Sequence, residues 1–157
     1  MKRLIIGLAV LAIASATGTA ARAGDDPAAA VTTDLQQLVS DATALHSAVT
    51  ADANKITADA TALQGTTDAK TARATLQADN QKVQSDRQQL VPPVLADWKQ
   101  LSSDLAAARS AKAGSASLRS ALQQAQQQLK QERQDVATAL KAARQAGLAL
   151  RQSLRKK

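Results

Sequence analysis

Apolar residues recur along most of this chain at spacings of three and four positions, which is the pattern expected for one buried face of a helix. The first series covers 32–63, with Thr32 or Thr33 as the expected N-cap and Gly65 as the expected stop. It predicts one long amphipathic helix. The positions expected to face the core are Leu35, Leu38, Ala42, Leu45, Val49, Ala53, Ile56, Ala60 and Leu63.

A second series starts near Thr67 or Asp68 and continues across Pro92-Pro93. Proline removes a backbone N–H and clashes with the preceding turn, so this pair must bend or end the helix. The aspartate spacing described below keeps its phase across the prolines. We therefore expect a kink between two collinear segments, and a reversing turn is the alternative.

A third series covers 117–154, with Gly114 as the expected break before it and Ser115 or Ser117 as the expected cap. Three long helices joined by short connections pack up-down-up. The predicted fold class is all-α, an antiparallel bundle of three long helices with the middle one kinked at Pro92-Pro93. A true turn at the prolines would instead make a four-helix bundle.

Aspartates recur in four short segments, each with Asp at both ends, Lys or Gln inside, and Leu, Ile or Val in fifth place. Within each half of the series the period is 18 residues, which is five turns of an α-helix. The second half repeats the first at an offset of 45 residues, which suggests duplication. The segments are 34–41, 52–59, 79–86 and 97–104.

These aspartates are expected to form a solvated rim beside the apolar face, paired with lysines on the same helix, as in Asp52 with Lys55 and Asp79 with Lys82. Asp residues seven positions apart are separated by ~10.5 Å along a helix, whereas Ca²⁺ needs oxygens at about 2.3–2.6 Å. One helix alone cannot hold a cation in this way. Two facing series could do so only weakly.

The first residues carry a different pattern, with a positive start, an uncharged apolar run over 4–14, and Ala21-Arg22-Ala23 before the expected cleavage point. This order is typical of a secretory signal peptide. The apolar run is shorter than the ~20 residues that a spanning helix needs. We expect a signal peptide over 1–23, one helical domain over 24–157, no membrane span after cleavage, and a periplasmic or secreted location.

Composition excludes most site chemistry. The chain has no Cys, Phe or Tyr, one Trp, and only Met1, His46 and Glu132 of their kinds. A His–Met haem pair, a di-iron set of Glu and His, a thiol nucleophile and a disulfide are therefore impossible within one mature chain. We expect no enzymatic activity, no cofactor and no metal. His46 is expected to lie partly exposed at the edge of its helix.

Charge is divided along the chain. Residues 115–157 carry nine Lys or Arg against two acidic residues, whereas 24–114 is net acidic. Cations near a helix C-terminus are favourable for the helix dipole, but they also attract anionic surfaces. The sole Trp98, next to the prolines, is the candidate contact for a protein partner. The candidate residues for contact with an anionic surface are Lys141, Arg144, Arg151, Arg155, Lys156 and Lys157.

These observations favour an exported, non-enzymatic helical bundle with a structural or interaction role in the cell envelope, docking anionic surfaces through its basic last helix. The alternative is a periplasmic chaperone or stress protein that binds unfolded clients. Nucleic acid is not expected as a partner, because export and the scarcity of aromatic residues both argue against it. Self-association is compatible with a thin, alanine-rich core, and the partner, an envelope component or a protein, is not identified.

Overall fold

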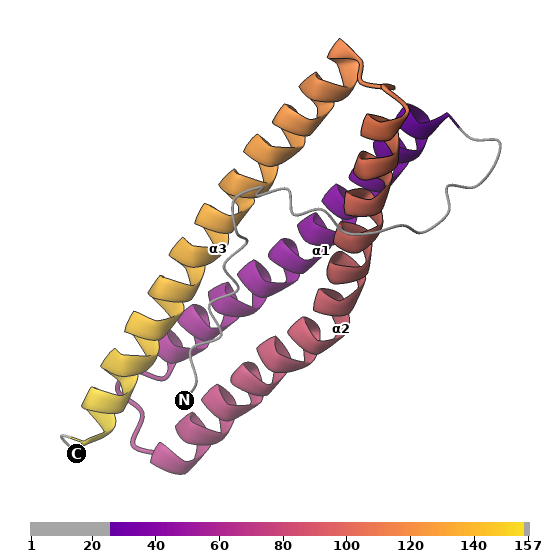
Figure 1. Cartoon of the computed structure of the whole chain (residues 1–157). Coiled ribbons are helices and arrows are strands. Elements are labelled where there is room, and N and C mark those ends of the chain that lie inside the picture. Colours follow the sequence, from indigo (N-terminus) through magenta and orange to yellow (C-terminus); the bar gives the residue numbers. More distant parts are fainter. Residues whose placement is uncertain (1–25, 156–157) are drawn as a thin grey trace.

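The computed structural model describes residues 26–155, so the predicted signal peptide over 1–23, together with Lys156 and Lys157, lies outside the described residues. Three helices follow one another: α1 (Pro27–Ala62), α2 (Ala69–Ser110) and α3 (Ala116–Arg155) (Figure 1). They contain 36, 42 and 40 residues. Each is therefore roughly 55–65 Å long. No strand occurs in 26–155, and the prediction of an all-α chain is confirmed.

The first helix begins earlier than predicted because of a cap that lies before the apolar series. The carboxylate of Asp26 accepts a hydrogen bond from the Ala28 N–H at 3.0 Å, and Pro27 occupies the first helical position, where its missing N–H costs nothing. The expected cap at Thr32 or Thr33 is wrong. Both threonine hydroxyls instead donate to carbonyls one turn back inside the helix.

The turn between α2 and α3 is closed by a Schellman motif. The Ala113 N–H donates to the Ala108 carbonyl at 2.9 Å, and the Lys112 N–H donates to the Arg109 carbonyl at 3.0 Å. Lys112 itself takes the left-handed conformation (φ 53°), so the helix ends there and not at Gly114 as expected. The predicted cap of α3 is confirmed at Ser115, whose hydroxyl accepts from the Leu118 N–H.

Helix α2 runs through Pro92 and Pro93 without a break, so residues 26–155 form three long helices and the four-helix alternative is wrong. The kink expected at this point stays a prediction. Both prolines are exposed, which places their missing N–H groups and their rings on the solvent side of the helix. That position limits the disturbance that they cause in the packed face.

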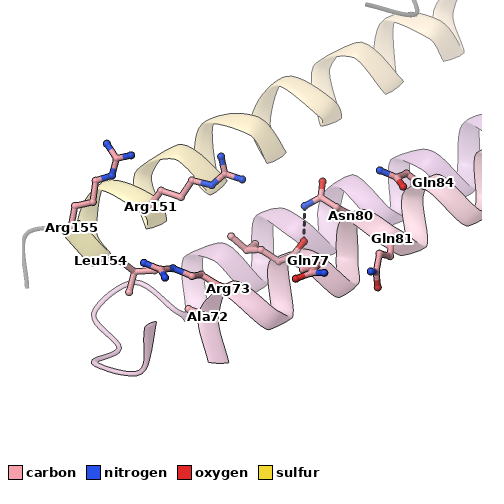
Figure 2. Close-up of a pocket in the computed structure, with 10 residues that line it drawn as sticks. Ala72, Arg73, Gln77, Asn80, Gln81, Gln84, Arg151, Leu154 and Arg155 are labelled. Atoms are coloured by element: carbon pink, nitrogen blue, oxygen red, sulfur yellow. Dashed lines mark hydrogen bonds between the residues drawn. The ribbon is translucent and has the colours of Figure 1, made fainter. Parts of the chain in front are cut away.

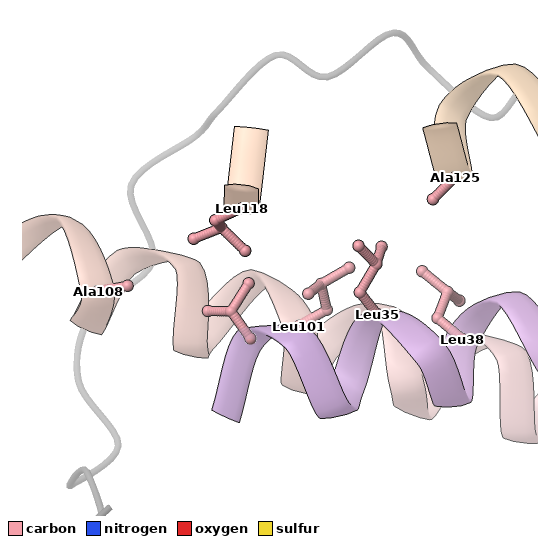
Figure 3. Packing of buried hydrophobic residues seen from close by; sticks show 7 residues of the cluster. Leu35, Leu38, Leu101, Ala108, Leu118 and Ala125 are labelled. Carbon is pink, nitrogen blue, oxygen red and sulfur yellow. The ribbon is translucent and has the colours of Figure 1, made fainter. Parts of the chain in front are cut away.

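The central element is α1, which packs along both other helices, whereas α2 and α3 contact each other little. Figure 1 shows α1 and α3 running in the same direction and α2 running against them. The buried residues form two clusters. The proximal core lies where α1 starts and α2 ends, and Figure 3 shows its leucines converging from the three helices. It contains Val31, Leu35, Leu38, Leu101, Ala108, Leu118 and Ala125.

The distal core lies at the other end of the molecule, where α1 ends, α2 starts and α3 ends. Alanine supplies more of this core than leucine does. Small side chains let helix axes approach closely, so short polar side chains that flank the apolar face of one helix can meet those of the neighbouring helix. Its buried members are Ala53, Ile56, Ala60, Ala72, Leu76, Ala143 and Leu150.

None of the helices within 26–155 combines the length and the apolar character needed to cross a membrane.

Candidate functional site

A groove of about 740 Å³ lies between the first turns of α2 and the last turns of α3 (Figure 2). It exists because α2 and α3 both pack on α1 but contact each other little. Its apolar part consists of two residues of the distal core and of Leu154, and the rest is amide and guanidinium. The lining residues are Ala72, Arg73, Leu76, Gln77, Asn80, Gln81, Gln84, Arg151, Leu154 and Arg155.

This groove is lined from two helices by three arginines, Arg73 of α2 and Arg151 and Arg155 of α3. All three residues are exposed, and none of the ion pairs within 26–155 includes them. A guanidinium stays charged at any physiological pH and offers a planar fork of donors that matches carboxylate and phosphate oxygens. The groove therefore presents positive charge and hydrogen-bond donors, and no acidic residue within 26–155 forms an ion pair with them.

Only part of the predicted cationic surface belongs to this groove. Arg151 and Arg155 line it, whereas Lys141 and Arg144 are exposed farther up α3 and are not among its lining residues. Lys156 and Lys157 lie outside the described residues. Sequence reasoning missed Arg73, which belongs to the net acidic part of the chain. The sequence did offer one indication of this role. Arg73 follows Ala72, which is buried, so the arginine side chain starts at the edge of the apolar face of α2.

The side chain of Trp98 is partly buried and packs against the proximal core. Its neighbours there include Leu101 and Leu105, on the same helix. An indole ring supplies more contact area than any other side chain, and this core is otherwise built from small and medium aliphatic residues. The structure thus gives Trp98 a packing role, and its contact with a partner stays a prediction.

A polar network joins α1 to α3 between the two cores. His46 Nδ1 lies 2.8 Å from one carboxylate oxygen of Glu132, and the Thr43 hydroxyl donates to the other at 2.8 Å. The Gln128 amide donates to Glu132 at 3.0 Å. Burial opposes ionisation of Glu132, but these hydrogen bonds outweigh it and lower the pKa of its carboxyl. His46 is thus a partner of α3, which sequence reasoning missed.

Aspartates of α1 and α2 meet across the antiparallel interface between these helices. In three places an aspartate of one helix faces an aspartate of the other closely enough that its charge and hydrogen bonding raise the pKa of that aspartate, and we call these couples the carboxyl pairs. Each joins the first aspartate of one repeat segment to the second aspartate of another. The carboxyl pairs are Asp34 with Asp104, Asp97 with Asp41, and Asp52 with Asp86.

The two remaining aspartates of the series are joined by an ammonium group. Lys55 Nζ contacts the carboxylate of Asp59 and lies 3.1 Å from Oδ1 of Asp79, which is only 6% exposed. A hollow of about 490 Å³ opens beside this contact and is also lined by Asp52 and Lys82. The lysine thus supplies hydrogen-bond donors and positive charge between two carboxylates that come from different helices.

The second aspartate of every segment accepts a hydrogen bond from the residue four positions before it. The predicted pairs Asp52–Lys55 and Asp79–Lys82 are therefore wrong. Each lysine pairs with the aspartate one turn later, because the first aspartate of its segment is turned toward the facing helix. The four donors and acceptors are Gln37 to Asp41, Lys55 to Asp59, Lys82 to Asp86, and Gln100 to Asp104.

The first aspartate of every segment keeps one buried carboxyl oxygen that has no hydrogen-bond partner, namely Oδ2 of Asp34, Asp52, Asp79 and Asp97. The expectation of a solvated rim is therefore wrong at these positions. Burial, followed by the hydrogen bond and the charge of Asp104, raises the pKa of Asp34 to about 6. Burial and the facing carboxylate likewise raise the pKa of Asp52 and of Asp97.

Within 26–155, no group of three or more histidine or acidic side chains is arranged to hold a metal ion. The aspartates meet two at a time, and the roughly four carboxyl oxygens of such a pair are fewer than the six to eight oxygens that Ca²⁺ takes. The geometry therefore offers charged groups for binding and for proton uptake. No family model matches the chain, and neither a curated protein nor a solved structure is found to be similar to it.

Proposed function

We propose that this chain is an exported, non-enzymatic helical-bundle protein that binds an anionic polymer of the cell envelope in the groove between α2 and α3. The observation that carries the proposal is that one groove is lined by three arginines without ion-pair partners in 26–155, namely Arg73, Arg151 and Arg155. Export rests on the signal-peptide pattern of 1–23.

The lining of the groove favours a sugar polymer over a lipid bilayer. Gln77, Gln81 and Gln84 line the same groove as the arginines, and their amides can donate to and accept from hydroxyl groups. A groove is concave and can enclose a chain, whereas helices that lie on membranes present an exposed apolar face with Trp, Phe and Leu. The only large apolar residues lining this groove are Leu76, which is 7% exposed, and the partly buried Leu154.

The test is co-sedimentation of residues 24–157 with purified cell-wall material that carries anionic polymers, at low and at high salt. We expect binding at low salt that weakens at high salt, because charged contacts are screened within about 10 Å at 0.1 M. The variant R73Q/R151Q/R155Q removes the guanidiniums from the groove and should reduce binding at least tenfold.

The matched control is R119Q/K130Q/R133Q, which removes the same charge from exposed residues of α3 that do not line the groove. It should bind as the parent chain does. If both triple variants lose the same amount of binding, net charge alone explains the loss, and that result would contradict a binding site in the groove. Binding to anionic lipid vesicles but not to cell-wall material would replace the polymer with a membrane surface. Salt-resistant suppression of client aggregation would favour the chaperone alternative.

A further inference from the structure

We propose that the interface between α1 and α2 is a proton-controlled clamp, in which each carboxyl pair takes up one proton on mild acidification and thereby draws the two helices together. This inference rests on a different part of the molecule from the groove and does not depend on it. It assigns a task to the repeated aspartates, which the binding of an anionic polymer leaves unexplained.

Asp59 and Asp79 show how two facing carboxylates can be held together by a hydrogen-bond donor between them. There, the ammonium group of Lys55 reaches both carboxylates and supplies the donors between them. Among the described residues, no ion pair links both members of a carboxyl pair, although Lys82 contacts Asp86 and its charge also acts on Asp52. The donor that fits between two adjacent carboxylate oxygens is a proton.

Protonation changes the contact from repulsion to a hydrogen bond. With both carboxyls ionised, two like charges face each other beside buried surface, and an oxygen such as Oδ2 of Asp34 has no partner. With one proton, the O–H of one carboxyl donates to the carboxylate of the other, and hydrogen bonds of this kind are short and strong. Each carboxyl pair contains one such orphaned oxygen, on Asp34, Asp52 or Asp97, so this site for a proton recurs along the interface. Oδ2 of Asp79 is orphaned as well, although Lys55 reaches Oδ1 of that carboxylate.

The groups that act on the carboxyl pairs come from the two helices that form the interface. From α2, Asp104 and Asp97 both act on Asp34 of α1. In the distal half, Asp79 and Asp86 oppose ionisation of Asp52, and Lys82 favours it. The acidic group by which α3 contacts α1 is Glu132, which pairs with His46.

Among residues 26–155, no cation acts on the pKa of Asp34 or Asp97 in the first two pairs, whereas Lys82 acts on the pKa of Asp52 in the third. Asp34 with Asp104 and Asp41 with Asp97 stand beside glutamines, since Gln37 and Gln100 take the places that Lys55 and Lys82 take in the distal half. We therefore expect the proximal half of the interface to respond most strongly to protons.

The direction of the pH effect follows from the raised pKa. An aspartate at 3.8 in the unfolded chain and at about 6 in the folded chain holds its proton more tightly when folded. Its contribution to stability is fully present below about 3.8 and is lost as the pH rises through about 6. Acidification from neutral pH should therefore stabilise the protein over this window, whereas carboxylates with ordinary ion pairs give the opposite trend.

The experiment measures the thermal unfolding of residues 24–157 between about pH 8 and about pH 5, together with a carboxyl-carbon NMR titration of the aspartates. We expect the unfolding temperature to rise by several degrees on acidification and the Asp34 carboxyl to titrate near pH 6. The variant D34N carries a permanent donor in place of the proton. It should unfold at a higher temperature than the parent at pH 8 and gain less on acidification.

The matched control is D135N, which removes one negative charge from an exposed position of α3 and should leave the acid gain unchanged. An unfolding temperature that is flat or falls over this range would overturn the proposal, as would an Asp34 carboxyl that titrates near 4. The NMR titration uses the parent chain, so it decides even where D34N does not fold. Stabilisation by Ca²⁺ at pH 8 equal to that by acid would overturn it too, in favour of a cation between the carboxylates.

Discussion

At the scale of single residues, the only histidine and the only glutamate of the chain are partners. His46 and Glu132 lie 86 positions apart and meet between α1 and α3, each with a side chain that is 19% exposed. Thr43 and Gln128 satisfy the other carboxylate oxygen of Glu132. Partly buried charges are tolerated when they are paired and hydrogen-bonded. Such a network favours one register of the two helices over registers in which these side chains would lose their partners.

Replacing Glu132 with glutamine should therefore destabilise the protein by about 1–3 kcal/mol at pH 7, because charged hydrogen bonds to His46, Thr43 and Gln128 are lost. The pKa of Glu132 is lowered from 4.5 in the folded chain, so its contribution is present above pH 4.5 and is lost as the pH falls through the folded value. The cost of E132Q should shrink in acid. Urea unfolding at two pH values measures it.

The control for this change is D135N, three residues along α3, which alters an exposed carboxylate and should shift stability by less than about 0.5 kcal/mol. A cost of E132Q no larger than that of D135N would contradict a stabilising role for the network.

At the scale of helices, the spacing of apolar residues predicted the helices and their buried faces wherever buried positions recur every three or four residues. The apolar series predicted all three helices and most of the buried face of α1, including Leu35 and Ala60. It misplaced the start of α1, because the cap at Asp26 lies outside the periodic region. It also left the effect of Pro92-Pro93 open, since a sequence does not reveal whether packing on a neighbouring helix outweighs the local cost of proline.

The candidate sites were predicted less well, because they depend on which helices are neighbours. The basic end of α3 predicted Arg151 and Arg155, but the groove also needs Arg73, which the packing of both α2 and α3 on α1 brings to the same groove. The spacing of the aspartates was evident, and it predicted a common face. That Asp34 would meet Asp104 depends on the register in which α1 and α2 align, and we did not predict this register from the spacing of the aspartates.

A prediction at this scale concerns the prolines. Replacing both Pro92 and Pro93 with alanine restores two backbone N–H donors on the exposed side of α2 and removes a cost of up to about 3 kcal/mol for each interior proline. We expect the double variant to be more stable by about 1–3 kcal/mol in urea unfolding. A loss of stability would instead mean that a bend at the prolines is required for α2 to reach both cores.

At the scale of the whole molecule, the three helices are not equivalent. Because α1 packs against both neighbours, whereas α2 and α3 contact each other little, each outer helix is held chiefly by α1. Both cores take buried residues from all three helices, so detaching α2 or α3 opens both cores along one side only.

Hydrogen exchange of the backbone amides should reveal this arrangement. We expect the slowest exchange in α1, and faster exchange in α2 and α3, because an outer helix can open locally while the rest stays folded. The measurement is mass spectrometry of peptides after exchange at neutral pH. Similar protection in all three helices would show that they open together as one cooperative unit. If the carboxyl pairs act as proposed, protection in α2 should increase on mild acidification.

The aspartate spacing of seven, eleven and seven residues reads the same in both directions. A tandem copy of such a pattern, folded back as a hairpin, therefore matches its own original position for position, as Asp34 with Asp104 and Asp52 with Asp86 illustrate. Because the spacing is symmetric, the aspartates of either helix can pair with those of the other helix in the antiparallel arrangement. For the same reason, the aspartates of α1 in one molecule would align with those of α1 in a second molecule if the two helices ran antiparallel.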